Sequence, residues 1–140
     1  MTDAQFSLQE HTADVAVAAT GDSLGDVFAA VADGLTAAMC EDVPATGGDR
    51  FAVELDAESR EALLFDYLDQ LIYERDVREV LPADNDATVT QAGDRWRVEA
   101  SARGVPLADV VAREVKAVTY SEMALERTDD GWRAYVVFDV

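Results

Sequence analysis

Hydrophobic residues recur at every second position in two short stretches of the first 20 residues, and then at the spacing of three or four that is typical of a helix. Alternating apolar side chains predict short strands at 6–10 and 15–20. Residues 24–39 then carry apolar side chains three and four positions apart, which predicts an amphipathic helix. Ser23 precedes this helix with Asp26 three residues on, so we expect the Ser23 hydroxyl to cap the helix.

The rest of the chain predicts a second helix and further strands. The helix is expected at about 58–77, where apolar residues form one stripe and Asp66 falls on the opposite side. Alternation predicts strands at 51–55, 87–91, 95–102, 116–127 and 132–140. The turns Ala92-Gly93-Asp94 and Asp129-Asp130-Gly131 are typical of hairpins that join neighbouring strands.

These elements predict a single α+β domain over residues 1–140. We expect two helices packed on one face of a mainly antiparallel sheet. Gly47-Gly48 and the stretch Pro82-Ala83-Asp84-Asn85-Asp86 indicate loops within this domain, and the sequence contains no internal repeat or linker.

Charge changes the expected function more than the expected fold. The 140 residues include 29 Asp and Glu against 11 Lys and Arg, a formal net charge of −18. A hydrophobic fraction of 49% argues against disorder. Because phosphates are bound by clustered Lys and Arg, we expect no direct binding to nucleic acid and none to an anionic membrane surface.

Ten of the 11 basic residues are Arg, and Lys116 is the only Lys. Excess carboxylate with little Lys is typical of proteins from salt-loving organisms, since molar salt shortens the Debye length to about 3 Å and weakens self-repulsion. The alternative is an acidic protein that recruits a basic partner. Lys116 itself either serves a site that needs a compact ammonium group or is retained by chance.

Targeting and cysteine content indicate a cytoplasmic protein. No apolar stretch reaches the length of a membrane helix, and the first residues do not have the pattern of a signal peptide. Cys40 is the only Cys, so neither an internal disulfide nor a cysteine metal cluster is expected. Its small-residue surroundings predict a buried apolar role.

Catalytic motifs are nearly absent. There is no glycine-rich phosphate loop and no G-x-S-x-G. His11, the only His, either orients a turn or binds a metal. Asp139 lies beside the terminal carboxylate of Val140, and such a pair would bind a hard cation if a third oxygen ligand were supplied. Spacing alone does not identify that ligand, and an independent enzyme is not expected.

Four blocks of sequence, in order along the chain, resemble the archease family. The blocks are His11-Thr12-Ala13-Asp14-Val15, Leu63-Leu64-Phe65-Asp66-Tyr67-Leu68, Glu114-Val115-Lys116-Ala117-Val118-Thr119-Tyr120 and the ending from Gly131-Trp132-Arg133 to Val137-Phe138-Asp139-Val140. The resemblance runs from about Phe6 to the last residue. It implies a strand-helix-strand-strand module with additional strands, which agrees with the α+β prediction.

The resemblance implies an accessory protein of the RtcB-type tRNA-splicing RNA ligase. That ligase uses GTP and Mn²⁺ to join tRNA exon halves through a guanylylated histidine, and archeases promote this guanylylation and repeated turnover. In the family a divalent metal is held by residues that correspond to Asp14, Asp139 and Val140. The expected metal is Ca²⁺, with Mg²⁺ or Mn²⁺ as alternatives. Asp42 is a weaker candidate ligand, and Asp66 and Lys116 are candidates for supporting the activity.

Two other functions stay open on the sequence. One is a general protein-binding module or chaperone for RNA-processing proteins, in which the metal is purely structural. The other is an independent metal-dependent hydrolase, which the missing nucleophile and base disfavour.

Overall fold

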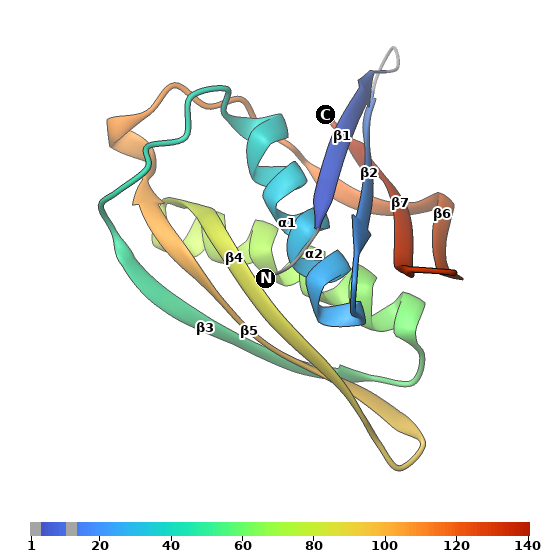
Figure 1. Ribbon diagram of the computed structural model, residues 1–140. Helices are drawn as coiled ribbons and strands as arrows, with labels where there is room; N and C mark the ends of the chain where they lie inside the picture. The colour runs from blue at the N-terminus through green and yellow to red at the C-terminus, as the bar shows by residue number, and fades with distance from the viewer. Residues whose placement is uncertain (1–3, 11–13) are drawn as a thin grey trace.

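In the computed structural model, which describes residues 4–10 and 14–140, two helices lie between two antiparallel sheets (Figure 1). Helix α1 (Leu24–Met39) packs against both sheets, and α2 (Arg60–Arg78) does the same beside it. The predicted α+β class, the two helices and the antiparallel pairing are therefore confirmed.

The strands form two sheets instead of the single sheet that was expected. The first sheet has the order β1 (Gln5–Glu10), β2 (Asp14–Gly21), β7 (Gly131–Asp139), β6 (Ala117–Thr128). The second has the order β3 (Asp49–Ala57), β5 (Arg95–Pro106), β4 (Val80–Ala92), and the short 3₁₀ helix η1 (Leu107–Asp109) follows β5. Since α1 is buried on nearly every side, it needs an apolar surface on both flanks, and one sheet provides only one.

Glycines allow α1 to lie close to both sheets. A Cβ at Gly25 would collide with the backbone of Ala87 in β4, and one at Gly34 would collide with the side chain of Val17 in β2. The cost of glycine in a helix, about 1 kcal/mol each, is offset here by close packing on both sides. Ser23 caps α1 as predicted, accepting a hydrogen bond from the backbone N–H of Asp26 at 3.1 Å.

The loop predicted at Pro82–Asp86 is wrong, because these residues continue β4. The β4–β5 register shifts between Ala83 and Asp86, so the extra residues form a bulge rather than a separate loop. A proline and a left-handed residue are tolerated there because β4 is an edge strand and Asp84, at φ 47°, is of a type that adopts this conformation.

The two predicted hairpins join β4 to β5 and β6 to β7, and both are confirmed. Cys40 is buried, as its surroundings predicted. Within residues 4–10 and 14–140, neither helix is long and apolar enough to cross a membrane.

Candidate functional site

The pairing of β2 with β7 brings two of the predicted metal ligands together. Asp14, the first residue of β2, lies directly opposite Asp139, the last residue of β7. In antiparallel strands, opposite side chains project on the same face with Cβ atoms about 5 Å apart, and like charges in this position are destabilising. The fold therefore places two carboxylates side by side at one end of the first sheet, a pairing that spacing alone could not identify and that the family resemblance implied.

Asp14 has an unsatisfied carboxylate oxygen. Its Oδ1 atom is buried and has no hydrogen-bond partner. No salt bridge among the described residues involves Asp14 or Asp139. A buried carboxylate oxygen without a partner is costly, and a bound cation would remove that cost. The donor set, two carboxylates, suits Ca²⁺ or Mg²⁺ better than a softer metal.

Further ligands for such a cation must come from other atoms. In the part of the chain that the structure describes, no three His, Cys, Asp or Glu side chains are grouped so that they could hold a metal. Val140, the third predicted ligand, directly follows Asp139 and packs against the core. Its main-chain oxygen therefore lies next to the Asp139 carboxylate in the chain. His11, Thr12 and Ala13 lie outside the described residues.

Lys116 lies at the same end of the sheet. Its backbone N–H donates a hydrogen bond of 2.8 Å to the carbonyl oxygen of Asp139, and its side chain is exposed. The next residue, Ala117, begins β6 and lies opposite Asp139. The main chain thus places Lys116, the only lysine of the sequence, beside Asp139.

Two arginines that sequence reasoning missed hold the segment before Lys116. Arg75 is only 6% exposed, and its Nη1 donates to the carbonyl oxygen of Val115 at 2.8 Å. Arg113 donates through its backbone N–H to Met39 and through Nε to Ala38, each at 2.7 Å, which satisfies carbonyls at the end of α1. One signal was readable: Arg75 follows Leu71 by four residues on the apolar stripe of α2, an unusual place for a charge.

Asp66 is exposed on α2, as the helical pattern predicted. The preceding residue, Phe65, stacks on Tyr120 of β6 with ring centroids 4.2 Å apart and planes inclined by 8°. Partial burial raises the pKa of Tyr120, and the negative charge of Asp66 raises it further. Asp66 is therefore near β6, but no hydrogen bond or salt bridge of the described residues joins it to Lys116.

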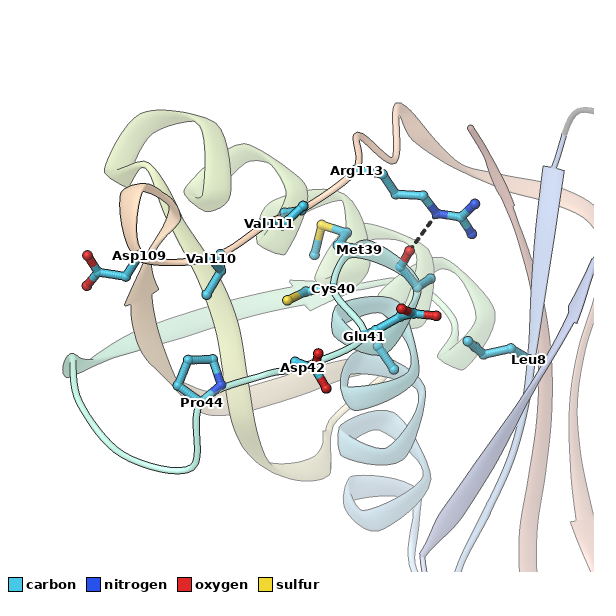
Figure 2. A pocket seen from close by; sticks show the side chains of 13 residues that line it. Leu8, Met39, Cys40, Glu41, Asp42, Pro44, Asp109, Val110, Val111 and Arg113 are labelled. Atoms are coloured by element: carbon cyan, nitrogen blue, oxygen red, sulfur yellow. Dashed lines mark hydrogen bonds between the residues drawn. The ribbon is translucent and has the colours of Figure 1, made fainter.

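Asp42, the weaker candidate, lies in the loop after α1 and lines a pocket of about 580 Å³ (Figure 2). It does not join the Asp14–Asp139 pair in any three-carboxylate group of the described residues. The predicted residues thus occupy three places: the end of the first sheet, the exposed side of α2 and this pocket.

Comparison with known proteins gives consistent matches along nearly the whole chain. The archease protein family (MTH1598/TM1083) matches residues 6–140. Protein archease of Pyrococcus furiosus is 31% identical over 140 residues, covering 97% of this chain and 99% of that protein.

Two solved structures share the fold. The solution structure of protein 1598 from Methanobacterium thermoautotrophicum is 27% identical with a TM-score of 0.85, covering 96% of this chain and 98% of that one. The structure of an archease from Thermotoga maritima, described as a possible chaperone, has a TM-score of 0.59 at 23% identity and covers 94% of each chain. At that identity the second similarity concerns the fold alone.

Proposed function

Since this chain belongs to the archease family, we propose that it is an accessory protein that activates an RtcB-type tRNA-splicing RNA ligase. In this role it promotes guanylylation of the ligase histidine and allows repeated turnover in tRNA exon joining. It binds the ligase rather than the RNA, and it uses a divalent cation held at the end of the first sheet.

The observation that carries this proposal is the Asp14–Asp139 pair. Two carboxylates opposite each other, one with a buried oxygen that no donor reaches, raise the free energy of the folded chain unless a cation lies between them. No salt bridge of the described residues involves Asp14 or Asp139, so no basic side chain offsets the charge of the pair directly.

Each residue then has a separate task. Asp14 and Asp139 hold the cation through carboxylate oxygens, and the main chain at Val140 supplies a further oxygen. A bound divalent cation supplies charge neutralisation and alignment for phosphate groups. Lys116, fixed by its bond to the carbonyl of Asp139, directs a compact positive charge at phosphate oxygens. Asp66 contacts the ligase from the exposed side of α2.

The net charge of −18 supports the division of labour between the two proteins. Nucleic acid is repelled by such a surface, so the ligase holds the RNA and this chain approaches the basic ligase. The same charge favours rapid association with a basic protein at low salt and weaker association as salt is added.

The test is multiple-turnover ligation by the cognate ligase with limiting ligase and added wild-type, Asp14→Ala, Asp139→Ala or Lys116→Ala protein. We expect the wild type to raise both the guanylylated fraction and the number of turnovers, and each variant to lose most of this stimulation. Asp94→Ala, an exposed carboxylate in the β4–β5 turn, is the matched control and keeps it. Full stimulation by all three site variants would overturn the assignment of the site.

One observation favours a second candidate function, a chaperone or general binding module with a structural cation. Asp14 and Asp139 are also the residues that end the β2–β7 ladder, so a cation between them would fasten the sheet. In that case chelation lowers the melting temperature without a selective effect on guanylylation. Stimulation that persists after chelation, at a temperature where the protein stays folded, identifies this alternative.

A further inference from the structure

A pocket of about 580 Å³ lies away from the two sheet cores, where the end of α1 meets the loop that follows η1 (Figure 2). Leu8 of β1 forms one wall, Met39 and Cys40 at the end of α1 form the floor, and residues 109–113 form the opposite wall. Its volume is in the range of clefts that bind small ligands or side chains, and the pocket is open to solvent on one side.

Two apolar side chains on the walls are exposed. Val111 is 94% exposed, so almost nothing in the described chain covers it, and Leu8 is 40% exposed. Val111 is also held in place, because Arg113 is bonded to the carbonyls of Ala38 and Met39. A fixed, exposed apolar residue beside a pocket is typical of a surface that another molecule covers.

The rim of the pocket is acidic. Glu41, Asp42 and Asp109 line it, all three are exposed, and none forms a salt bridge with a described residue. The C-terminal end of α1 adds partial negative charge and has no basic residue in its last turn. Arg113 is the only basic residue among the described residues of the lining, and its Nε is engaged by the carbonyl of Ala38. An occupant therefore gains from carrying positive charge.

These features exclude other occupants. Nucleic acid would be repelled by the rim. A second copy of this chain would bring its own excess of carboxylates against three more, since 29 acidic residues face only 11 basic ones. A metal ion alone would leave the exposed Val111 and Leu8 uncovered. A polypeptide segment with both apolar and basic side chains satisfies the walls and the rim together.

We propose that this pocket is the docking site for a segment of the partner protein in which an apolar side chain stands next to Lys or Arg. The apolar side chain packs against Val111 and Leu8, and the basic one lies among Glu41, Asp42 and Asp109. We identify the partner as the RNA ligase, and this part of the inference rests on the proposed function. Arg113 in the wall is three residues before Lys116, so a segment bound here lies next to the chain that leads to the Asp14–Asp139 pair.

The test measures binding of the intact protein to its cognate ligase by biolayer interferometry at low and high salt. Val111→Glu places a charge where the apolar anchor packs, and Glu41→Lys reverses a rim charge. Neither substitution disturbs the core, since both side chains are exposed and a lysine after α1 suits the helix dipole. The matched controls are Ala52→Glu, at an exposed position of β3, and Asp94→Lys in the β4–β5 turn.

We expect Val111→Glu to raise Kd at least tenfold, mainly through faster dissociation. Glu41→Lys should slow association and flatten its salt dependence, because rim charges act mainly on the encounter rate. The controls should stay within twofold of wild type. If the wild type binds and stimulates the ligase while both pocket variants bind as it does, the docking proposal is overturned and the proposed function stands. If the wild type neither binds nor stimulates the ligase, both are overturned.

Discussion

Two carboxylates, Asp84 in the second sheet and Asp14 in the first, differ in whether the fold supplies them with a hydrogen-bond donor. Asp84 lies in the β4 bulge, where the Nε of buried Arg103 donates to it at 2.6 Å. The same guanidinium donates to the carbonyl oxygens of Gly47 and Pro44. Asp14 has a buried oxygen with no donor and faces a second carboxylate, Asp139.

We propose that this difference separates carboxylates that serve the fold from those that serve a ligand, in a chain that has 29 acidic residues. Asp84 has a donor although it is largely exposed. In the proposed function, Asp14 lacks a donor because a cation supplies the missing contact. The folded chain then carries a local cost in free energy until the ligand binds.

The largest expected effect comes from removing the donor at the structural carboxylate. Arg103→Met should lower the free energy of unfolding by about 3 kcal/mol, because two loop carbonyls lose their only charged donor and Asp84 loses its partner. Urea denaturation measures this loss. The exposed pair Arg95–Asp56, with N···O at 3.4 Å, provides the control, and Arg95→Met should cost less than about 1 kcal/mol. Equal losses in the two variants would contradict the structural role of Arg103.

The functional pair should respond in the opposite sense. Without divalent cation, Asp14→Asn should be at least as stable as wild type, because it removes repulsion from Asp139. With Ca²⁺ at a hundred times its Kd, wild type should gain about 2.7 kcal/mol and the variant should gain little. Thermal unfolding with and without Ca²⁺ measures both states. A calcium-dependent gain of the same size in Asp14→Asn would refute the role of this carboxylate.

Arg75 is buried like Arg103, but the segment that it holds ends at Lys116, beside the Asp14–Asp139 pair. Arg75→Met should lower the free energy of unfolding by about 2 kcal/mol, because the carbonyl of buried Val115 loses its donor. It should also weaken Ca²⁺ binding, which a purely structural role would not change. Calorimetric titration measures this second effect. Arg75→Lys keeps the charge and should show a smaller change in both quantities.

The smallest effect is expected at the pair Glu74–Arg78 on α2, in which the Arg78 side chain is exposed and the Glu74 side chain is largely covered. A hydrogen bond from Arg78 lowers the pKa of Glu74, and burial opposes this only in part. Because the folded pKa is below the unfolded value of 4.5, the stabilisation is present above that pH and is lost as the pH falls through the folded pKa. Glu74→Gln should therefore cost about 0.4 kcal/mol at neutral pH and nothing in strong acid. A difference that persists in strong acid would show another cause.

Local features of the fold could be predicted from the sequence, and distant pairings could not. The helix at 24–39, its cap at Ser23 and the turn at Asp129-Asp130-Gly131 depend on neighbouring residues, and all are confirmed. The division into two sheets depends on which strands pair across the chain, which periodicity does not encode. Proline and polar residues at Pro82–Asp86 predict a loop, whereas the structure has a bulge in β4. A strand tolerates such residues only at the edge of a sheet, and the sequence does not show that β4 is an edge strand.

The candidate site shows the same limit. Spacing does not identify a partner for Asp139. The family resemblance implies Asp14, and the β2–β7 register places the two residues opposite each other. The role of Arg113 depends on carbonyls brought close by the fold, so no spacing rule could have identified it. For Arg75, spacing places a charge on the apolar stripe of α2 but does not identify the carbonyl of Val115 as its partner. The role of Lys116 stays a prediction, supported by its backbone bond to Asp139.

The most direct test of the central claim is a Ca²⁺ titration by isothermal calorimetry in about 1 M KCl, where screening suppresses diffuse binding to the acidic surface. The account predicts one bound cation per chain in wild type, none in Asp14→Asn and one in Asp84→Asn, the control in which asparagine keeps the left-handed conformation. Binding that survives in Asp14→Asn, or is lost only in Asp84→Asn, would contradict it.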